Sequence, residues 1–303
     1  MNRRARNALA AAAGLGLDRL LGEPPAAIHP VAGFGRVMNR VERTLWRDAR
    51  TPGIAYAATG TILGVGAGRL LRSTAATVAL AVAGRELRRV ARQISDQCSA
   101  GDLDAARRTL PALVGRDPSQ LDESGIAAAV IESLAENSVD AVVAPVFWAV
   151  LAGAPGAAAY RAINTMDAMV GQRSTRYARF GWAAARLDDA ANYLPARLFA
   201  LLVAVAAPHE QRAIWAVVRR DAPAHPSPNA GVAEAAVAAA LGLELGGPLR
   251  YGDRQEIRPR LGSGPRPQPA DIVRAIRLVN RTERLLIGTL LTGGVVGALR
   301  LRR

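Results

Sequence analysis

The sequence predicts an all-α protein, a multi-pass bundle of membrane helices with polar helical loops between them. Two stretches, 51–68 and 141–160, run for eighteen and twenty residues without a charged side chain, and one span of a bilayer needs about 20 apolar residues. Strand-like alternation is scarce, whereas helical periodicity recurs in the polar connections. We therefore expect a single integral-membrane helical domain over residues 1–303, with polar helical insertions at about 85–125 and 209–270.

Five apolar segments are candidates for membrane-spanning or buried helices. Two contain a full-length uncharged stretch, and the other three are marginal in length. Arg69 and Arg72 divide the longest segment into one full span and a shorter piece, either a second helix or a re-entrant tail. Asp18 and Arg19 interrupt the first segment before any cleavage site, so we expect a retained helix rather than a signal peptide. The segments are 7–22, 51–84, 141–160, 190–208 and 285–299, and arginines after the last one are typical of a cytoplasmic anchor.

The chain is rich in apolar and basic residues. Half of its 303 residues are apolar and the mean hydropathy is +0.10, which fits a protein with some helices in lipid and substantial polar loops. All 39 basic residues are arginine and the net charge is +14. Lack of lysine can reflect nucleotide composition alone, but the charge attracts phosphate groups and anionic lipid. The arginines are scattered without interleaved aromatic residues, which excludes a nucleic-acid partner, and the single cysteine, Cys98, excludes an internal disulfide and a cysteine-based zinc site.

The polar connections contain helix signals of their own. Residues 85–95 are amphipathic, and 101–115 predict a short helix entered through Asp102. A helix is predicted for 231–242, whereas 259–269, rich in Pro and Gly, predicts a flexible linker. The connections are therefore expected to be mostly helical.

A first group of carboxylates follows the helical period. Glu132, Glu136 and Asp140 are four residues apart, so a continuous helix places them along one face. Like charges in a stripe repel each other unless a cation or arginines lie opposite, and hard cations such as Mg²⁺ prefer carboxylate oxygen. A solvated helix face is the alternative interpretation. Apolar residues on both sides of the stripe favour a site for Mg²⁺ or a Mg–nucleotide complex.

Two further polar groups follow along the chain. The second consists of Asp188, Asp189 and Asn192, with Arg186 before it and Arg197 after it. The third, at positions i, i+3 and i+6 of a helical stretch, consists of Arg161, Asn164 and Asp167. Salt bridges between helices would explain any one group. Three such groups close together favour a site for Mg²⁺, phosphate and a charged substrate.

Two histidines, His29 and His225, each precede a proline. A loop histidine is more often structural than catalytic, and both roles stay open. Asn229 and its neighbours could cap the helix that follows, whose N-terminus offers backbone N–H groups to an anion. Glu234 would lie in the first turn of that helix. Capping and anion binding are compatible.

Several familiar motifs are absent from the sequence. It contains no P-loop, no glycine motif of the dinucleotide-binding type, no GxSxG and no HExxH. Any ATP is therefore bound by something other than a P-loop.

Blocks of the sequence together resemble one known family. They read DRLLGEPPAAIHPV, GRD, ESLAENSVDAVVAPVFW, NTMDAMVG, RYARFGWAAARLDDAANYLPARL and HPSPNAG, and they follow the family's order from Asp18 to Tyr251. These blocks are similar to the adenosylcobinamide-phosphate synthase family of cobalamin biosynthesis (CobD/CbiB). The resemblance implies a multi-pass membrane enzyme that condenses a carboxylate of adenosylcobyric acid with (R)-1-aminopropan-2-ol, or its O-phosphate, and consumes ATP. The product would be adenosylcobinamide or its phosphate.

The polar groups supply candidates for such an amide synthesis, in which the carboxylate is activated as an acyl phosphate and attacked by the amine. The candidate catalytic residues are Glu132, Glu136, Asp140, Asp188, Asp189 and His225. The expected Mg²⁺ ligands are Glu136, Asp140 and Asp188. The candidate substrate-binding residues are His29, Asn137, Arg161, Asn164, Asp167, Arg173, Arg176, Arg186, Asn192, Arg197, Asn229 and Glu234. Of these, Arg173, Arg176, Arg186 and Arg197 would hold phosphate groups, and His225, or else His29, would accept a proton from the ammonium group.

The resemblance also implies partners and a location. Mg²⁺ and the co-substrate ATP are expected, together with the corrinoid and aminopropanol substrates, the lipid bilayer and other late enzymes of the pathway. We expect the inner (cytoplasmic) membrane, with the site on the cytoplasmic side and with Glu136 and Asp188 facing one pocket. The alternatives are a non-catalytic membrane scaffold for corrinoid enzymes and a transporter of a phosphorylated or corrinoid anion.

Overall fold

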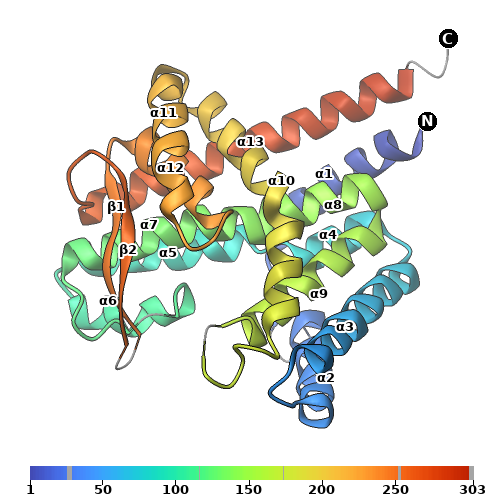
Figure 1. The fold of residues 1–303 in the computed structure, drawn as a ribbon. Helices are drawn as coiled ribbons and strands as arrows, with labels where there is room; N and C mark the ends of the chain where they lie inside the picture. Colours follow the sequence, from blue (N-terminus) through green and yellow to red (C-terminus); the bar gives the residue numbers. More distant parts are fainter. Residues whose placement is uncertain (26–28, 116, 173, 252–253, 300–303) are drawn as a thin grey trace. The chain divides into compact units, whose positions relative to one another are not determined.

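The computed structural model describes residues 1–299 except 26–28, 116, 173 and 252–253 (Figure 1). The described part is predominantly helical, so the prediction of an all-α fold is confirmed. Its helices are α1 (Arg3–Leu21), α2 (Pro30–Leu45), α3 (Arg50–Leu71), α4 (Thr74–Ala81), α5 (Gly84–Ser99), α6 (Leu103–Thr109), α7 (Glu123–Ser138), α8 (Ala144–Ala152), α9 (Ala154–Val170), α10 (Trp182–Ala206), α11 (Gln211–Asp221), α12 (Ala230–Leu241) and α13 (Pro269–Leu299). A π-helical turn (Val139–Val143) joins α7 to α8, and an antiparallel hairpin of β1 (Glu244–Tyr251) and β2 (Arg254–Gly262) precedes α13.

The chain divides into two compact units, each built from segments that are distant in the sequence. The first unit contains Met1–Gly84, Asp140–Asn192 and Ile287–Arg303, and the second contains Arg85–Val139 and Tyr193–Leu286. Residues 85–125 and 209–270, the two predicted polar insertions, both lie in the second unit. The two insertions therefore belong to one compact body.

Close backbone contact between α3 and α9 organises the first unit. Gly60, Gly64 and Gly68 are buried on α3, which packs along α9. A Cβ atom added to Gly68 would lie 2.5 Å from the carbonyl oxygen of Ala154, and one added to Gly64 would lie 2.7 Å from the Cβ atom of Ala162. Small residues at this spacing allow two helix backbones to approach closely. The glycines therefore set the distance between the two helices.

A glycine turn divides the stretch 141–160, which the sequence predicts as one span. Gly153 has a φ of 71°, a conformation that side-chain-bearing residues rarely adopt. It reverses the chain, so that α8 and α9 pack against each other. The helix of spanning length is instead Glu123–Ala152. The prediction for 141–160 is wrong because absence of charge does not reveal where a glycine turns the chain.

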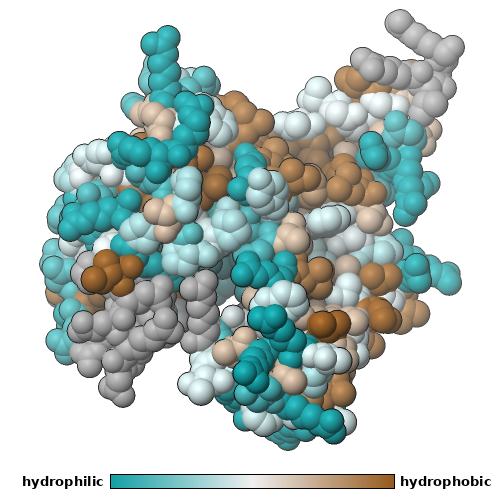
Figure 2. Space-filling view, viewed as in Figure 1, coloured by the Kyte–Doolittle hydropathy of each residue, from teal (hydrophilic) through white to brown (hydrophobic). Residues whose placement is uncertain are grey.

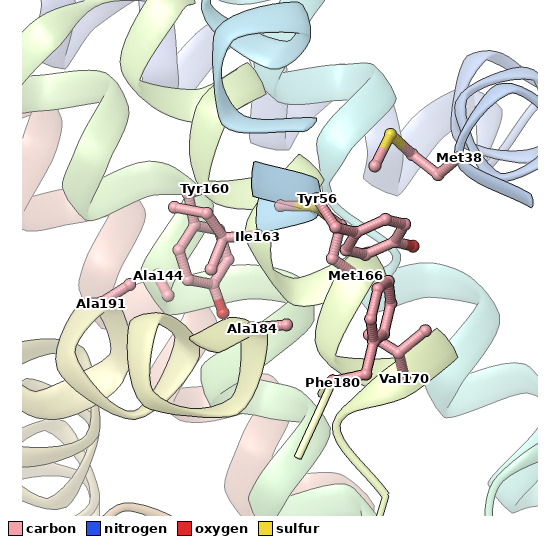
Figure 3. Packing of buried hydrophobic residues seen from close by; sticks show 10 residues of the cluster. All are labelled: Met38, Tyr56, Ala144, Tyr160, Ile163, Met166, Val170, Phe180, Ala184 and Ala191. Atoms are coloured by element: carbon pink, nitrogen blue, oxygen red, sulfur yellow. The ribbon is translucent and has the colours of Figure 1, made fainter. Parts of the chain in front are cut away.

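A cluster of large buried side chains holds α2, α3, α9 and α10 together within the first unit. Tyr56, Met166 and Phe180 are fully buried, and the rings of Tyr56 and Phe180 lie 5.2 Å apart between centroids. Figure 3 shows these side chains together with Tyr160, whose hydroxyl points toward α10. A buried phenol needs a hydrogen-bond partner. Tyr160 thus links the apolar core to polar side chains on α10.

The second unit packs an alanine-rich helix against several neighbours. α12 contacts α7, α11 and both strands of the hairpin, and nearly all of its residues are buried. A helix that is apolar all round is covered on all sides. The hairpin contains a bulge between Leu245 and Gly247, where Gly246 has a φ of 78°.

Two helix predictions in the second unit are confirmed. The amphipathic segment 85–95 forms part of α5, with Val90 and Ile94 buried. The short helix α6 begins after Asp102, whose carboxylate accepts a hydrogen bond of 2.9 Å from the backbone N–H of Ala105.

The predicted linker 259–269 is partly wrong. Its first four residues belong to β2, and Gly262 pairs with Glu244. The loop before α13 is therefore shorter than composition suggests. Glycine at positive φ can belong to a bulged strand as well as to a linker, and composition does not distinguish the two.

Within the part of the chain that the structure describes, four helices are long and apolar enough to cross a bilayer, namely Arg50–Leu71, Glu123–Ala152, Trp182–Ala206 and Pro269–Leu299. The predicted segments 190–208 and 285–299 overlap the last two, and α1 is not among the four. Apolar side chains remain exposed on these helices: Ile62 is 69% and Leu70 83% exposed. Figure 2 shows apolar side chains, in brown, in broad surface patches. Such patches on helices of spanning length are typical of contact with lipid, and the chain is a membrane protein.

Replacing Gly68 by alanine is expected to destabilise the first unit. The added Cβ would meet the carbonyl of Ala154, and overpacking of this kind typically costs about 1–3 kcal/mol. Gly66→Ala on the same helix is the matched control, since an added Cβ there has nothing within 4 Å. Alanine is the better helix former by up to about 1 kcal/mol, so the control should be neutral or stabilising. Thermal unfolding in detergent measures both, and equal melting temperatures of the two variants would contradict the close packing.

Candidate functional site

The candidate residues form two sets, one in each unit. The first unit contains His29, Asp140, Arg161, Asn164, Asp167, Arg176, Arg186, Asp188, Asp189 and Asn192. The second contains Glu132, Glu136, Asn137, Arg197, His225, Asn229 and Glu234. Arg173 lies outside the described residues. Because Glu136 and Asp188 belong to different units, their sharing of one pocket stays a prediction.

In the first unit, the three predicted polar groups meet at the side-chain amide of Asn164, which lies close to a carboxylate from each of the other two groups. The Nδ2 atom of Asn164 lies 3.2 Å from Oδ2 of Asp140 and 3.4 Å from Oδ1 of Asp188. The amide of Asn192 donates to Oδ2 of Asp188 at 3.0 Å. Tyr160 completes the group, which we call the Asn164 cluster: Asp140, Tyr160, Asn164, Asp188 and Asn192.

Tyr160 is the member of the cluster that sequence reasoning missed. It is buried, and its hydroxyl donates to Oδ1 of Asn192 at 2.8 Å and lies 3.5 Å from Oδ1 of Asp140. It is the last residue of the uncharged stretch 141–160, which the sequence predicts only as an apolar helix. Its position four residues before Asn164, on the same helix face, is the signal that could have located it.

Local helix geometry aims these side chains at one another. Tyr160 and Asn164 are four residues apart on α9, and Asp188 and Asn192 are four residues apart on α10. Each pair therefore projects from one face of its helix. Asp140 joins them from the π-helical turn.

The three carboxylates of the first predicted group do not form one stripe. The α-helix that carries Glu132 ends at Ser138, and Asp140 lies in the wider π-helical turn that follows. In an α-helix the carbonyl of Ala141 would accept a hydrogen bond from the backbone N–H of residue 145. Pro145 has no N–H, which is a local reason for the wider turn. The prediction of a continuous face is wrong because it assumed 3.6 residues per turn throughout.

Arg161 lies beside the Asn164 cluster, and His29 lies within the influence of the Arg161 charge. Nη1 of Arg161 donates to Oδ1 of Asn164 at 3.2 Å. Burial, and secondarily the positive charge of Arg161, lower the pKa of His29. The ring of His29 accepts the backbone N–H of Val31 at 3.2 Å through Nδ1 and so caps α2, which also requires that nitrogen to be unprotonated. His29 is thus a neutral helix cap, and Asp167 lies further along α9, beside Gly171.

Arg176 and Arg186, two of the arginines predicted to hold phosphate, have partners within the protein. Arg176 donates to the buried carboxylate of Glu42 at 3.0 Å and stacks on Trp46, 4.5 Å from its ring centroid. Arg186 pairs at 3.3 Å with Asp189 on α10. These arginines would have to exchange one partner for another in order to bind phosphate.

In the second unit, His225 is buried and both of its ring nitrogens are engaged. Nε2 lies 2.8 Å from a guanidinium nitrogen of Arg258 and 3.8 Å from Glu234. A guanidinium group can only donate, so Nε2 accepts from Arg258. Nδ1 lies 3.1 Å from both the backbone nitrogen and the carbonyl oxygen of Ser227. For His225 to accept a proton from a substrate, Arg258 must first leave Nε2. No spacing in the sequence points to Arg258.

Asn229 stands at the N-cap position of α12 but makes no side-chain cap hydrogen bond, and a hydroxyl acceptor comes instead from Ser227. Its hydroxyl accepts the backbone N–H of Ala230 at 3.2 Å, whereas Oδ1 of Asn229 accepts from Arg197 at 3.1 Å. Glu234 is buried in the second turn of α12 and not, as predicted, in the first. These contacts tie α10 to the loop before α12.

Glu132 anchors the β-hairpin. It is 5% exposed, and its Oε1 accepts the backbone N–H of Gly246, in the bulge, at 2.8 Å. Asn137 donates to Ser133 in its own helix at 2.9 Å, and Glu136 is exposed on α7. A buried carboxylate on a backbone N–H is a strong, charge-assisted contact.

The Asn164 cluster has the donor chemistry for Mg²⁺. Among the described residues, no three His, Cys, Asp or Glu side chains lie close enough together to hold a metal by themselves. Mg²⁺, however, is commonly bound through one or two carboxylates, with substrate phosphate and water completing its octahedron. Asp140 and Asp188 provide such a pair of carboxylates, and amide oxygens lie beside them.

Comparison with known proteins gives consistent matches over most of the chain. The family described as CobD/Cbib protein matches residues 11–279. The cobalamin biosynthesis protein CobD of Mycobacterium tuberculosis is 48% identical over 276 residues, 86% of this chain and 88% of that protein. Proteins of the same name from Rhodobacter capsulatus (42% over 305 residues, 94% and 96%) and Chromobacterium violaceum (45% over 282 residues, 88% and 89%) are also similar. No solved structure matches the chain.

Acidification is expected to destabilise the first unit through His29. Because the folded protein lowers the pKa of His29 below 6.5, it binds a proton less readily than the unfolded chain does. This contribution to stability is complete above pH 6.5 and is lost as the pH falls through 6.5 toward the folded-state pKa. His29→Asn keeps an N-cap acceptor but does not titrate. Melting temperatures across this range should fall less for the variant than for the wild type, and parallel profiles would refute the assignment.

Removing the acceptor at Glu132 is expected to loosen the hairpin. Glu132→Ala leaves the Gly246 N–H without this partner, and a buried unsatisfied donor costs about 1–3 kcal/mol. Glu132→Gln keeps an oxygen in the same place and should cost less. Thermal unfolding and amide exchange at Gly246 report on both variants. A glutamine variant as unstable as the alanine variant would rule out the anchoring role.

Proposed function

The chain belongs to the CobD/CbiB family of cobalamin biosynthesis, and we propose that it is a membrane-bound amide ligase of that pathway. The proposed reaction joins a carboxylate of adenosylcobyric acid to (R)-1-aminopropan-2-ol or its O-phosphate, with ATP as co-substrate. The product is adenosylcobinamide or its phosphate.

The Asn164 cluster is the observation that carries this proposal. Asp140 lies in the helix Glu123–Ala152 and Asp188 lies in α10, and both helices are of spanning length. Ionisable side chains are costly in such helices and by default indicate a functional site. Two carboxylates joined by one amide suit a cationic group, such as the ammonium of an amino alcohol or a Mg²⁺–phosphate complex.

The proposed chemistry consists of two displacements. A carboxylate oxygen of the corrinoid attacks the γ-phosphorus of ATP, the P–O bond to ADP breaks, and an acyl phosphate forms. The amine nitrogen then attacks the acyl carbon, inorganic phosphate leaves, and the nitrogen loses a proton. One ATP therefore becomes ADP and phosphate for each amide formed. The protein has to orient the amine, accept its proton and neutralise phosphate charge.

Each of these tasks can be given to a residue of the first unit. Asp188 binds the ammonium group and accepts its proton, and Asn164 and Asn192 orient the Asp188 carboxylate through their amides. Arg161, which donates to Asn164, provides positive charge for a phosphate group. Asp140 and Asp188 would hold Mg²⁺, which when bound supplies charge neutralisation on phosphate oxygens. His225 is not part of this assignment, because Arg258 already donates to its Nε2.

We place the enzyme in the inner membrane with the site on the cytoplasmic side, because ATP and the corrinoid are cytoplasmic. The net charge of +14 supports contact with anionic lipid at that surface. Other late enzymes of the pathway are the proposed protein partners there.

Asp188→Asn is expected to lower product formation by about 100-fold, because the amide keeps the shape of the carboxylate but neither attracts an ammonium group nor accepts its proton. The assay supplies purified protein in detergent with adenosylcobyric acid, Mg–ATP and either form of the amine, and measures cobinamide product and ADP. Glu86→Gln is the matched control, since it removes an exposed ion pair with Arg89 on α5 and should keep wild-type activity.

The outcomes separate the proposal from its rivals. Product with one ADP per amide supports the ligase. A wild-type protein that forms no product with either amine contradicts it and favours a membrane scaffold or a transporter. An Asp188→Asn variant that is as active as the wild type would reject the site while leaving the reaction in place.

A further inference from the structure

Two prolines, Pro145 and Pro195, lie close in sequence to Asp140 and Asn192 of the Asn164 cluster, and each releases a backbone carbonyl. Proline has no N–H, so the carbonyl four residues before it loses its α-helical donor. Pro145 releases the carbonyl of Ala141, and Pro195 releases that of Ala191. Both alanines are buried. A buried carbonyl needs another donor.

Both carbonyls receive a donor from elsewhere in the first unit. The backbone N–H of Ala83 donates to the carbonyl of Ala141 at 2.9 Å. The indole Nε1 of Trp148, on α8, donates to the carbonyl of Ala191 at 3.0 Å. The second contact is made by a side chain and ties α8 to α10. It can therefore be removed by a single substitution.

The carbonyl bound by Trp148 lies in the turn of α10 that presents the site. Asn192 follows Ala191 directly, accepts from Tyr160 at 2.8 Å and donates to Asp188 at 3.0 Å. A rotation or slide of this turn would lengthen both contacts. The hydrogen bond that fixes the Ala191 carbonyl therefore also fixes Asp188 and Asn192, the two side chains that α10 contributes to the Asn164 cluster.

We propose that Trp148 is a positioning residue, which holds Asp188 and Asn192 in place by bonding the carbonyl that Pro195 releases. As a statement about catalysis, this rests on the proposed function. Pro195 and Trp148 act as a pair: with any other residue at 195, the backbone would supply the donor and the indole N–H would be dispensable. The pair is consequently expected to behave non-additively under mutation.

The alternative is that Trp148 merely fills space, since it packs against the buried cluster shown in Figure 3. The two explanations differ in one respect. If Trp148 only fills space, Trp148→Phe lowers activity by the same factor whichever residue stands at position 195. If Trp148 acts through its hydrogen bond, Pro195→Ala compensates for the activity that Trp148→Phe loses. The compensation is specific because Pro195→Ala restores a backbone donor to the Ala191 carbonyl without replacing the indole ring.

The test is a double-mutant cycle of Trp148→Phe and Pro195→Ala, measured in detergent by kcat, by KM for the amine and by melting temperature. Trp148→Phe should lower kcat/KM about ten-fold, and the double variant should return to within about three-fold of Pro195→Ala alone. Trp215→Phe, on α11 in the second unit, is the matched control and should behave like the wild type.

Several results would overturn the inference. If the two effects multiply, so that the double variant is about ten-fold less active than Pro195→Ala alone, no hydrogen-bond pair exists. If Trp148→Phe does not fold, recovery of folded protein in the double variant supports the pair, and equal failure of both rejects it. If the wild type forms no product, the proposed function fails together with any role in a ligase site. The melting-temperature cycle then still decides whether Trp148 and Pro195 are coupled.

Discussion

Polar groups on helices packed among apolar residues have to find their partners within the protein, because neither lipid nor an apolar core can provide them. The first unit meets this requirement at Asn164, whose amide donates to two carboxylates and whose oxygen accepts from Arg161. The Asn164 side chain thus forms hydrogen bonds with anionic and cationic neighbours at the same time. Changing it would affect the position of every charged group around it.

The same constraint explains why several residues with the character of catalytic groups have structural contacts in the second unit. Glu132 binds a backbone N–H of the hairpin, and His225 accepts from Arg258. Arg88 forms an ion pair with Glu283, which is buried. Breaking a buried pair by removing one partner is costly because the other is left without compensation. Loss of activity in these variants would therefore not by itself show a catalytic role, so stability has to be measured beside activity.

The sequence was sufficient to predict several of the helices, but not how the candidate site residues are brought together. Composition and periodicity located α5, and Asp102 located the start of α6, because these signals are local. The turn at Gly153 and the π-helical turn depend on backbone conformation that no hydropathy pattern encodes. Tyr160 was missed for a related reason, since an aromatic residue in an apolar stretch is informative only once its neighbour on the facing helix is known.

Helix irregularity and site geometry are connected in this protein. A regular α-helix presents side chains only in the directions that its period allows, and two straight helices would align their i, i+4 pairs without bringing in a second carboxylate. Here Asp140 lies in a π-helical turn, and the turn that carries Asn192 precedes a proline. Each irregularity releases a backbone carbonyl, and each carbonyl is bound by a different neighbour. The hydrogen bonds to the carbonyls that the two prolines release are therefore also the hydrogen bonds that orient the carboxylates. The site is held in place because the backbone carbonyls of its own helices need donors.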